Sequence, residues 1–144
     1  MFSKSCEYAF RAVVYLCSRS TEDPIAKIKE ISDSIKAPMH YTSKVLQQLS
    51  RKGIIGSQKG PNGGFYVDSR FTNIKLIEVV KVIDGEKVFT GCAMGIIPCS
   101  ETNPCVMHER FKKIRNELNE MMQDITIHQL ADGLHSGELK MKLY

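Results

Sequence analysis

Three cysteines and a histidine lie close together in the second half of the chain and form its most chemically suggestive pattern. Six residues separate Cys92 from Cys99, five separate Cys99 from Cys105, and His108 follows three residues later. Thiolates clustered in this way bind iron–sulfur clusters or zinc. Zinc sites often use only two to four residues between paired cysteines, so the wider spacing favours an iron–sulfur cluster over zinc.

A second pattern, between Ser34 and Val67, is typical of DNA recognition. This stretch contains no acidic residue but several basic ones, which indicates a surface for phosphates. A helix expected over 39–52 carries small polar and basic side chains away from its apolar stripe, as do helices that enter the major groove. We expect base contacts from His40, Ser43, Lys44 and Gln47, phosphate contacts from Lys36, Arg51, Lys52 and Lys59, and a mixed core and phosphate role for Tyr41.

The segment Gly60-Pro61-Asn62-Gly63-Gly64 has strong turn chemistry and predicts the tip of a β-hairpin. Its flanks, 54–59 and 65–67, are expected to be short strands. Glycine adds no side chain, so the backbone of this tip can approach a sugar-phosphate chain closely. Lys59 beside the tip is placed to reach a phosphate or the minor groove. In isolation the motif is only a hairpin turn, but its position directly after a helix-turn-helix pattern favours a DNA-binding wing.

The elements that position these groups follow from hydrophobic periodicity and breakers. Helices are expected over 3–20, 27–35, 39–52, 74–84, 103–123 and 127–135, with the cysteines in a loop over 91–104. The order helix, short helix, helix and hairpin predicts a mainly α fold with a small β-hairpin wing. We expect a winged helix-turn-helix DNA-binding domain with a linking helix over 1–84, a cluster loop over 85–105, and a dimerisation helix with a C-terminal short helix over 106–144.

The long fifth helix carries an apolar series spaced by four, three, four, three and four residues: Met107, Phe111, Ile114, Leu118, Met121 and Ile125. This spacing is typical of the seam between two packed helices. The partner is a second copy of the chain or, alternatively, the chain's own winged domain. Cys105 and His108 are three residues apart, so both side chains are expected to lie on one face of this helix.

Composition excludes several classes of protein. The 144 residues are 42% hydrophobic and 25% charged, as in a soluble globular chain. No apolar run reaches the roughly 18 residues of a membrane span, and no signal core follows Met1, so a cytoplasmic location is expected. An odd count of five cysteines without an export signal favours reduced thiols. The absence of a nucleophile–base–acid set or a phosphate-binding loop argues against an enzyme.

Three stretches of the sequence resemble one bacterial family. The run 37–49, the segment Lys52-Gly53-Ile54-Ile55 and the segment 59–65 resemble the Rrf-type winged-helix repressors, whose branches include IscR, NsrR and CymR. The opening Ser5-Cys6-Glu7-Tyr8-Ala9 also fits, and the resemblance extends to about residue 135. It implies a homodimer with crossing long helices, palindromic double-stranded DNA operators and no membrane.

The resemblance also implies cluster ligands at Cys92, Cys99 and Cys105. In the iron–sulfur assembly branch the fourth ligand falls on His108 and the cluster is 2Fe–2S; in the nitric-oxide branch it falls on Glu7 of the partner, and the cluster is 4Fe–4S. We favour His108 and 2Fe–2S, because His108 lies one helical turn from Cys105. Alternatives are a zinc- or thiol-based regulator of the same fold, or a metal or electron-transfer protein that does not bind DNA. Two features depart from the family pattern, namely the six-residue spacing after Cys92 and Ser43 in place of a glutamate.

Overall fold

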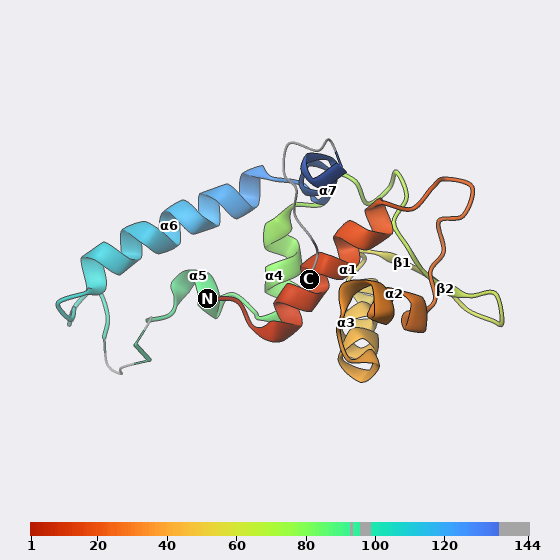
Figure 1. Cartoon of the computed structure of the whole chain (residues 1–144). Coiled ribbons are helices and arrows are strands. Elements are labelled where there is room, and N and C mark those ends of the chain that lie inside the picture. The colour runs from red at the N-terminus through yellow and green to blue at the C-terminus, as the bar shows by residue number, and fades with distance from the viewer. Residues whose placement is uncertain (93, 96–98, 136–144) are drawn as a thin grey trace.

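Helix α1 (Lys4–Cys17) runs through the middle of the structure, a computed structural model that describes residues 1–92, 94–95 and 99–135. Helices α2 (Ile28–Ile35) and α3 (Met39–Arg51) pack against it (Figure 1). Their apolar stripes meet in one core, in which the largest fully buried side chains include Leu16, Ile31, Ile35, Leu46 and Leu49. The expected order of three helices in the N-terminal half is confirmed.

Helix α1 is shorter than predicted because both of its ends are capped by serines. The Ser3 hydroxyl accepts a hydrogen bond from the Cys6 backbone N–H at 3.1 Å, and the Ser3 N–H donates to Asp84 at the end of a later helix. At the other end the Ser18 hydroxyl donates to the Tyr15 carbonyl. The helix therefore stops at Cys17, and the prediction that it continues to residue 20 was wrong.

The wing is a two-stranded antiparallel hairpin of β1 (Gly56–Gln58) and β2 (Gly64–Tyr66). Ser57 lies opposite Phe65 in the register. Ala26 adds a bridge to Phe65, with two backbone hydrogen bonds of 2.9 Å, and so fastens the wing to the segment before α2. The first strand is shorter than expected because Ile54 and Ile55 are buried in the core and do not pair with the hairpin.

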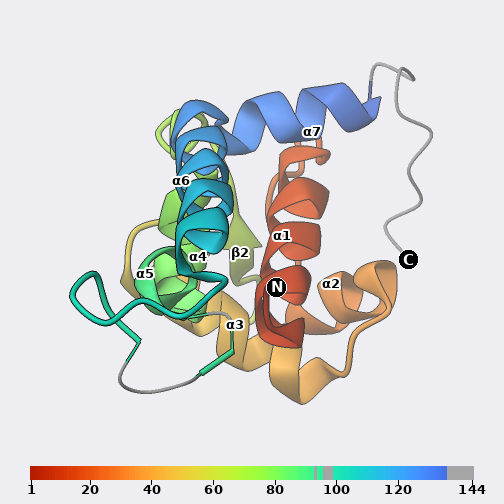
Figure 2. The same ribbon diagram turned by 90° about the vertical axis from the view of Figure 1, so that its left-hand side faces the viewer.

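Four helices complete the fold: α4 (Leu76–Ile83), α5 (Lys87–Thr90), α6 (His108–Asp124) and α7 (Ile127–His135). The start of α4 is paired with the junction of α6 and α7, since Leu76 N–H donates to the Ile125 carbonyl and Ile127 N–H donates to the Ile74 carbonyl. Helix α7 crosses one end of α1 (Figure 2). Helix α6 extends from this junction, away from the wing, to the cysteine segment (Figure 1).

The long helix begins at His108, not at 103–104, and the prediction that Cys105 lies on it was wrong. Ser100 and Asn103 pair through both backbone groups, at 3.1 and 3.2 Å, so the Asn103 groups are not available to start a helix. Cys105 instead lies in the segment before α6, although the His108 N–H still donates to its carbonyl at 3.0 Å. The four-residue helix α5 was not predicted and lies within the expected 85–105 loop.

Of the helices in the described ranges, none is both long and apolar enough to cross a bilayer. Residues 93 and 96–98 of the expected cluster loop, and residues 136–144 of the expected 106–144 unit, lie outside the described residues.

Candidate metal centre and nucleic-acid interface

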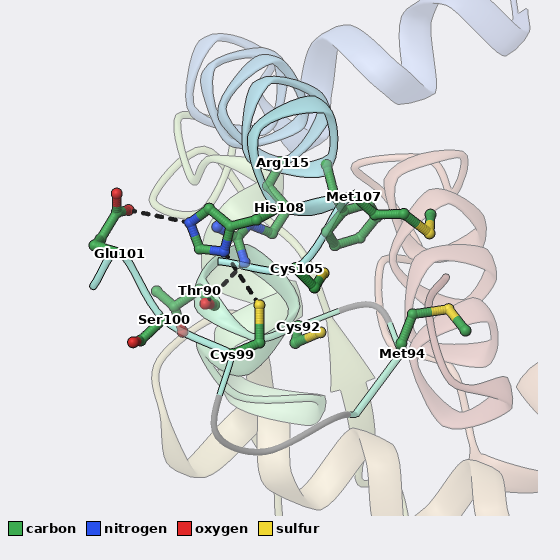
Figure 3. A pocket seen from close by; sticks show the side chains of 11 residues that line it. Thr90, Cys92, Met94, Cys99, Ser100, Glu101, Cys105, Met107, His108 and Arg115 are labelled. Carbon is green, nitrogen blue, oxygen red and sulfur yellow. Dashed lines mark hydrogen bonds and ion pairs between the residues drawn. The ribbon is translucent and has the colours of Figure 1, made fainter. Parts of the chain in front are cut away.

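The three clustered cysteines and His108 line one cavity of about 260 Å³, between the end of α5 and the start of α6 (Figure 3). The Cys99 Sγ lies 3.3 Å from Nδ1 of His108. The His108 side chain is only 10% exposed, whereas the three cysteines are half-buried. The structure therefore brings together all four side chains that the sequence singled out as ligands.

The thiols are close enough to perturb one another. A backbone hydrogen bond from Cys105 lowers the pKa of Cys99, but desolvation and the neighbouring thiols of Cys105 and Cys92 outweigh it, so the pKa is raised overall. Crowded thiols resist ionisation because their negative charges repel, and a bound cation removes that penalty. Three thiols and an imidazole nitrogen on one cavity are a donor set that fits an iron–sulfur centre.

The other ring nitrogen of His108 faces a charged pair at the rim of the cavity. Nε2 lies 3.6 Å from Oε1 of Glu101, and the same oxygen accepts a hydrogen bond from Nζ of Lys112 at 2.7 Å. This contact with Lys112 lowers the pKa of Glu101 and raises that of Lys112. Donor atoms of Glu101, His108 and Glu109 all lie within 4.8 Å of one another.

Arg115 of α6 joins this helix to the end of α5 beside the cavity. Its guanidinium donates to the Thr90 carbonyl at 3.0 Å and to the Gly91 carbonyl, next to Cys92. It also lies 5.6 Å from the ring centre of Phe111. Glu101, Lys112 and Arg115 were not predicted from the sequence. Positions 108, 112 and 115 share one helical face, which could have signalled the last two.

Glu7, the alternative fourth ligand, is placed elsewhere. It lies on α1, 2.7 Å from Nζ of Lys4 and 3.8 Å from a guanidinium nitrogen of Arg11, and the hydrogen bond from Lys4 lowers its pKa. It does not line the cysteine cavity of its own chain. A ligand role for Glu7 therefore requires a second subunit, as the family resemblance implied.

Helix α3 presents the expected polar face to solvent. The rings of His40 and Tyr41 stack with centroids 4.1 Å apart, and the Gln47 amide donates to the Ser43 hydroxyl at 3.2 Å. Tyr41 is 46% exposed, so the prediction that it lies partly in the core was wrong. Thr42 is buried in its place, because its hydroxyl is satisfied by the Pro38 carbonyl.

A groove of about 770 Å³ separates α3 from the wing, and it collects part of the predicted DNA-binding set. Lys36, His40, Ser43 and Lys44 do not line it. The bridge from Ala26 to Phe65 carries Lys27 to the groove, a contact that no local sequence pattern signals. The lining joins the predicted residues Gln47, Arg51, Lys59, Gly60, Pro61, Gly63 and Gly64 with residues that were missed, including Lys27, Ser50, Ser57 and Gln58.

Two wing glycines are required by the chain itself. Gly60 has φ +103°, a conformation that other residues rarely adopt. A Cβ on Gly64 would lie 2.3 Å from the Ala26 carbonyl oxygen. The exposed residues Pro61 and Asn62 form the tip between them. These glycines are thus needed for the fold of the wing itself. They would in addition allow a partner to approach its backbone closely.

The basic residues of this face are available for a partner. Within the described ranges, Lys44, Arg51, Lys52 and Lys59 have no acidic partner within ion-pair distance, and all four are exposed. Lys36 occupies the turn between α2 and α3 in the left-handed conformation, with φ 54°. Exposed cations without internal partners suit phosphate binding.

Comparisons with known proteins agree with this architecture. Residues 2–133 match the Rrf2 family, described as iron-dependent transcriptional regulators. An HTH-type transcriptional regulator of Aquifex aeolicus is 28% identical over 134 residues, which is 92% of each chain. CymR, the global cysteine regulator of B. subtilis, superposes with a TM-score of 0.72 at 20% identity over 92% of this chain and 96% of that one. IscR of T. potens superposes with a TM-score of 0.68 at 18% identity over 96% and 91% of the two chains.

Proposed function

The chain belongs to the Rrf2 family of transcriptional regulators, and from this premise we propose that it is a homodimeric repressor that senses iron–sulfur status, redox or nitric oxide through a bound cluster. The observation that carries the proposal is the single cavity lined by Cys92, Cys99, Cys105 and His108. It lies where α5 meets α6, at the opposite end of the molecule from the wing (Figure 1).

On DNA, α3 would lie in the major groove. His40, Ser43 and Lys44 would meet base edges, and the exposed cations would meet phosphates. Gln47 and Arg51 line the groove toward the wing, where Lys59 and the tip would follow the adjacent backbone. Two copies would place two α3 helices about one DNA turn apart, roughly 34 Å, on a palindromic operator.

The proposed dimer rests on the apolar side of α6. Of the residues of this helix, Met122 alone is buried within the chain. Ile114 is 50% exposed and Met121 is 46% exposed, as is Met107 just before the helix. A second copy of α6 would cover this row, as the heptad-like spacing predicts.

At the metal centre, Cys92, Cys99 and Cys105 would supply thiolates and His108 the fourth donor, through the nitrogen that faces Cys99. A bound cluster would supply redox- and nitric-oxide-sensitive chemistry. The 2Fe–2S form is favoured over 4Fe–4S because His108 already lies at the cavity, whereas Glu7 does not.

The structure also supports a route from the cavity to the DNA-binding unit. Arg115, at the middle of α6, holds this helix to the end of α5, and the backbone pairing of α4 with the α6–α7 junction holds its C-terminal end. A change in the angle of α6 at the cavity would therefore change how the two winged units are spaced in the dimer.

Anaerobic purification followed by absorption and Mössbauer spectroscopy tests the centre. Serine in place of Cys92, Cys99 or Cys105 should each abolish the chromophore, while Cys17→Ser on α1 should retain it. His108→Ala should lose or destabilise the cluster and Glu7→Ala should not; the reverse result would assign the carboxylate scheme.

A labelled operator, selected from random DNA by the purified protein, tests the sensor. Cluster-loaded and cluster-free dimers should differ in affinity at equal salt, by about 1–3 kcal/mol of coupling, and DNA should change cluster retention by the same factor. Equal affinities of folded, dimeric forms for every operator would leave a constitutive DNA-binding protein.

A zinc-based regulator of the same fold is the second candidate, because three cysteines and one histidine are also a known structural zinc set. Metal analysis of the anaerobic protein separates the two. Stoichiometric zinc with no iron or sulfide would favour zinc.

A further inference from the structure

We propose that Glu101 is a positioning residue that fixes the tautomer of His108. The Glu101 carboxylate holds the imidazole proton on Nε2 and thereby leaves the Nδ1 lone pair directed at the cysteine cavity. This inference deepens the proposed metal centre and rests on it for its biological use. The contact on which it is built is a property of the chain alone.

The geometry sets the two ring nitrogens in different surroundings. Nδ1 is 3.3 Å from Cys99 Sγ, on the cavity side, while Nε2 is 3.6 Å from Glu101 Oε1, on the rim side (Figure 3). Nε2 is buried, and no hydrogen-bond partner for it falls within bonding distance among the described residues. Buried polar atoms are rarely left unpaired, and a small movement of Glu101, whose side chain is 65% exposed, would bring its carboxylate to hydrogen-bond length.

Lys112 fixes the position and the charge of the Glu101 carboxylate. Its ammonium donates to Oε1 of Glu101 at 2.7 Å, the same oxygen that faces His108. This contact holds the carboxylate at the rim in its ionised form, so that it accepts a hydrogen bond from the Nε2–H group and does not donate one to Nε2. A carboxylate that accepts the second N–H of a metal-binding histidine fixes its tautomer and ring orientation and raises its basicity.

A divalent cation bound by Glu101, His108 and Glu109 is the competing use of the same atoms. The Lys112 ammonium already occupies the Glu101 oxygen, and its positive charge repels a dication there. Both carboxylates are also exposed to water, which weakens their hold on an ion. The role of Glu101 as hydrogen-bond acceptor for the Nε2–H group of His108 is therefore favoured over a second metal site.

The first experiment reads the tautomer in the full, metal-free chain by long-range ¹⁵N–¹H correlation spectra of labelled histidine. His108 should carry its proton on Nε2. Glu101→Ala should shift the population toward the Nδ1–H form, and Glu101→Gln should restore the Nε2–H form, because the amide oxygen still accepts. Glu117→Ala, an exposed carboxylate further along α6, is the matched control. An Nδ1–H tautomer in the unaltered chain, or no change in Glu101→Ala, would overturn the proposal.

The second experiment uses the cluster-loaded dimer. The cluster is first reduced by one electron with dithionite, because an oxidised 2Fe–2S cluster has no net spin. With ¹⁵N placed selectively in one ring position, pulsed electron paramagnetic resonance should then detect the strong metal coupling at Nδ1. Glu101→Ala should hold the cluster about 10–100-fold less tightly, the usual cost in metal affinity of removing an outer partner, and should therefore lose it to a chelator faster. Lys112→Met should have a smaller effect in the same direction, and Lys113→Met should have none. Strong coupling at Nε2, or tight zinc binding by the metal-free chain that requires both Glu101 and Glu109, would contradict the proposal.

The two experiments separate this inference from the proposed function. If the chain takes up no cluster, the metal centre fails, and the tautomer spectra still judge the contact between Glu101 and His108. If the cluster binds through Nδ1 with unchanged stability in Glu101→Ala, the metal centre stands and the role of Glu101 fails.

Discussion

The winged unit and the cysteine end of the molecule are supported in different ways. In the winged unit, α1, α2 and α3 bury one another, and Leu16, Ile31 and Leu46 are at most 1% exposed. In α6, which leads to the cavity, Met122 is the one buried residue of the helix. The first region has a complete core within one chain, whereas in the second the apolar row of α6 stays exposed and the thiols line an open cavity, where we propose a partner subunit and a metal.

Charge follows the same division. Four exposed cations near α3 and the wing have no acidic partner within ion-pair distance among the described residues, namely Lys44, Arg51, Lys52 and Lys59. At the cavity, Lys112 is paired with Glu101 and Arg115 is bonded to the carbonyls at the end of α5. The cations proposed to bind phosphates have no acidic partner in the described residues, while the cations beside the cavity are paired within the chain. This contrast indicates which surfaces are finished in the folded chain and which await a ligand.

The largest expected effect is a loss of stability in the winged unit that has no counterpart in α6. Leu46→Ala removes a fully buried side chain from the winged core and should lower the free energy of unfolding by about 2–5 kcal/mol, the usual cost of such a cavity. Ile114→Ala on the exposed row of α6 should change it by no more than about 0.5 kcal/mol at concentrations where the chain is monomeric. Urea unfolding followed by circular dichroism measures both. Equal losses would mean that α6 is as much a part of the core as α3.

Dimer formation, in contrast to the stability of the monomer, should depend on the exposed row of α6. Ile114→Glu places a charge in the row that a second α6 would cover, so the dimer should dissociate while the monomer stays folded. Operator affinity should fall about tenfold or more, because two linked half-sites become independent. Sedimentation at several concentrations and operator titration measure these effects. Glu117→Gln serves as the control, and an unchanged dimer in Ile114→Glu would remove α6 from the interface.

The buried thiol of the winged unit gives a pH-dependent distinction. Burial, followed by the nearby Asp84 carboxylate, raises the pKa of Cys6 to about 12, whereas an unfolded thiol has a pKa of about 8.5. The Cys6 thiol therefore keeps its proton to a higher pH in the folded state than in the unfolded state. The contribution of Cys6 to stability is complete below about pH 8.5 and is lost as the pH rises toward 12, by up to about 1.4 kcal/mol per unit.

Unfolding of the native chain and of Cys6→Ala, compared from pH 8 to pH 10.5, isolates this contribution from other groups that titrate there. The native chain should lose stability more steeply than Cys6→Ala. Parallel curves would show that the Cys6 thiol ionises as easily in the folded chain as in the unfolded one.

The same division decided what the sequence could predict. The winged fold followed from strong local signals: the stripe of Val45, Leu46 and Leu49, the breaker at Pro38 and the turn at Gly60. The errors in element bounds lay at the ends, where Ser18 stops α1 and where Ile54 and Ile55 join the core. Tyr41 was assigned partly to the core because an aromatic at helical spacing resembles a core residue, and the smaller Thr42 took that place through its bond to Pro38.

At the cavity the sequence singled out the four side chains that the structure brings together, but it did not predict the residues around them. Cysteine spacing is visible along the chain, whereas the approach of Glu101 to His108 depends on the turn at Ser100–Asn103, which also delayed the start of α6. The contact of Arg115 with Thr90 and Gly91 depends on α5, a helix too short to leave a periodic signal. Contacts between elements of this kind require tertiary placement.

The smallest expected effect concerns Lys59, a single cation of the proposed DNA-binding surface. Lys59 is exposed at the edge of the groove between α3 and the wing, and no acidic residue in the described ranges neutralises it. If it contacts one phosphate, Lys59→Ala should reduce the slope of log affinity against log salt by about one unit on any DNA sequence. The loss in affinity should therefore be about 3–4-fold greater at 50 mM than at 200 mM salt.

Lys4→Ala is the matched control, because Lys4 is already paired with Glu7 and lies on α1, away from the groove. Its salt slope should equal that of the unaltered protein. Ser43→Ala should behave differently from both, because a base contact changes which operator is preferred and leaves the slope unchanged. An unaltered slope in Lys59→Ala would remove the wing from the DNA contact. The unpaired cations of α3 would then have to account for the whole electrostatic footprint.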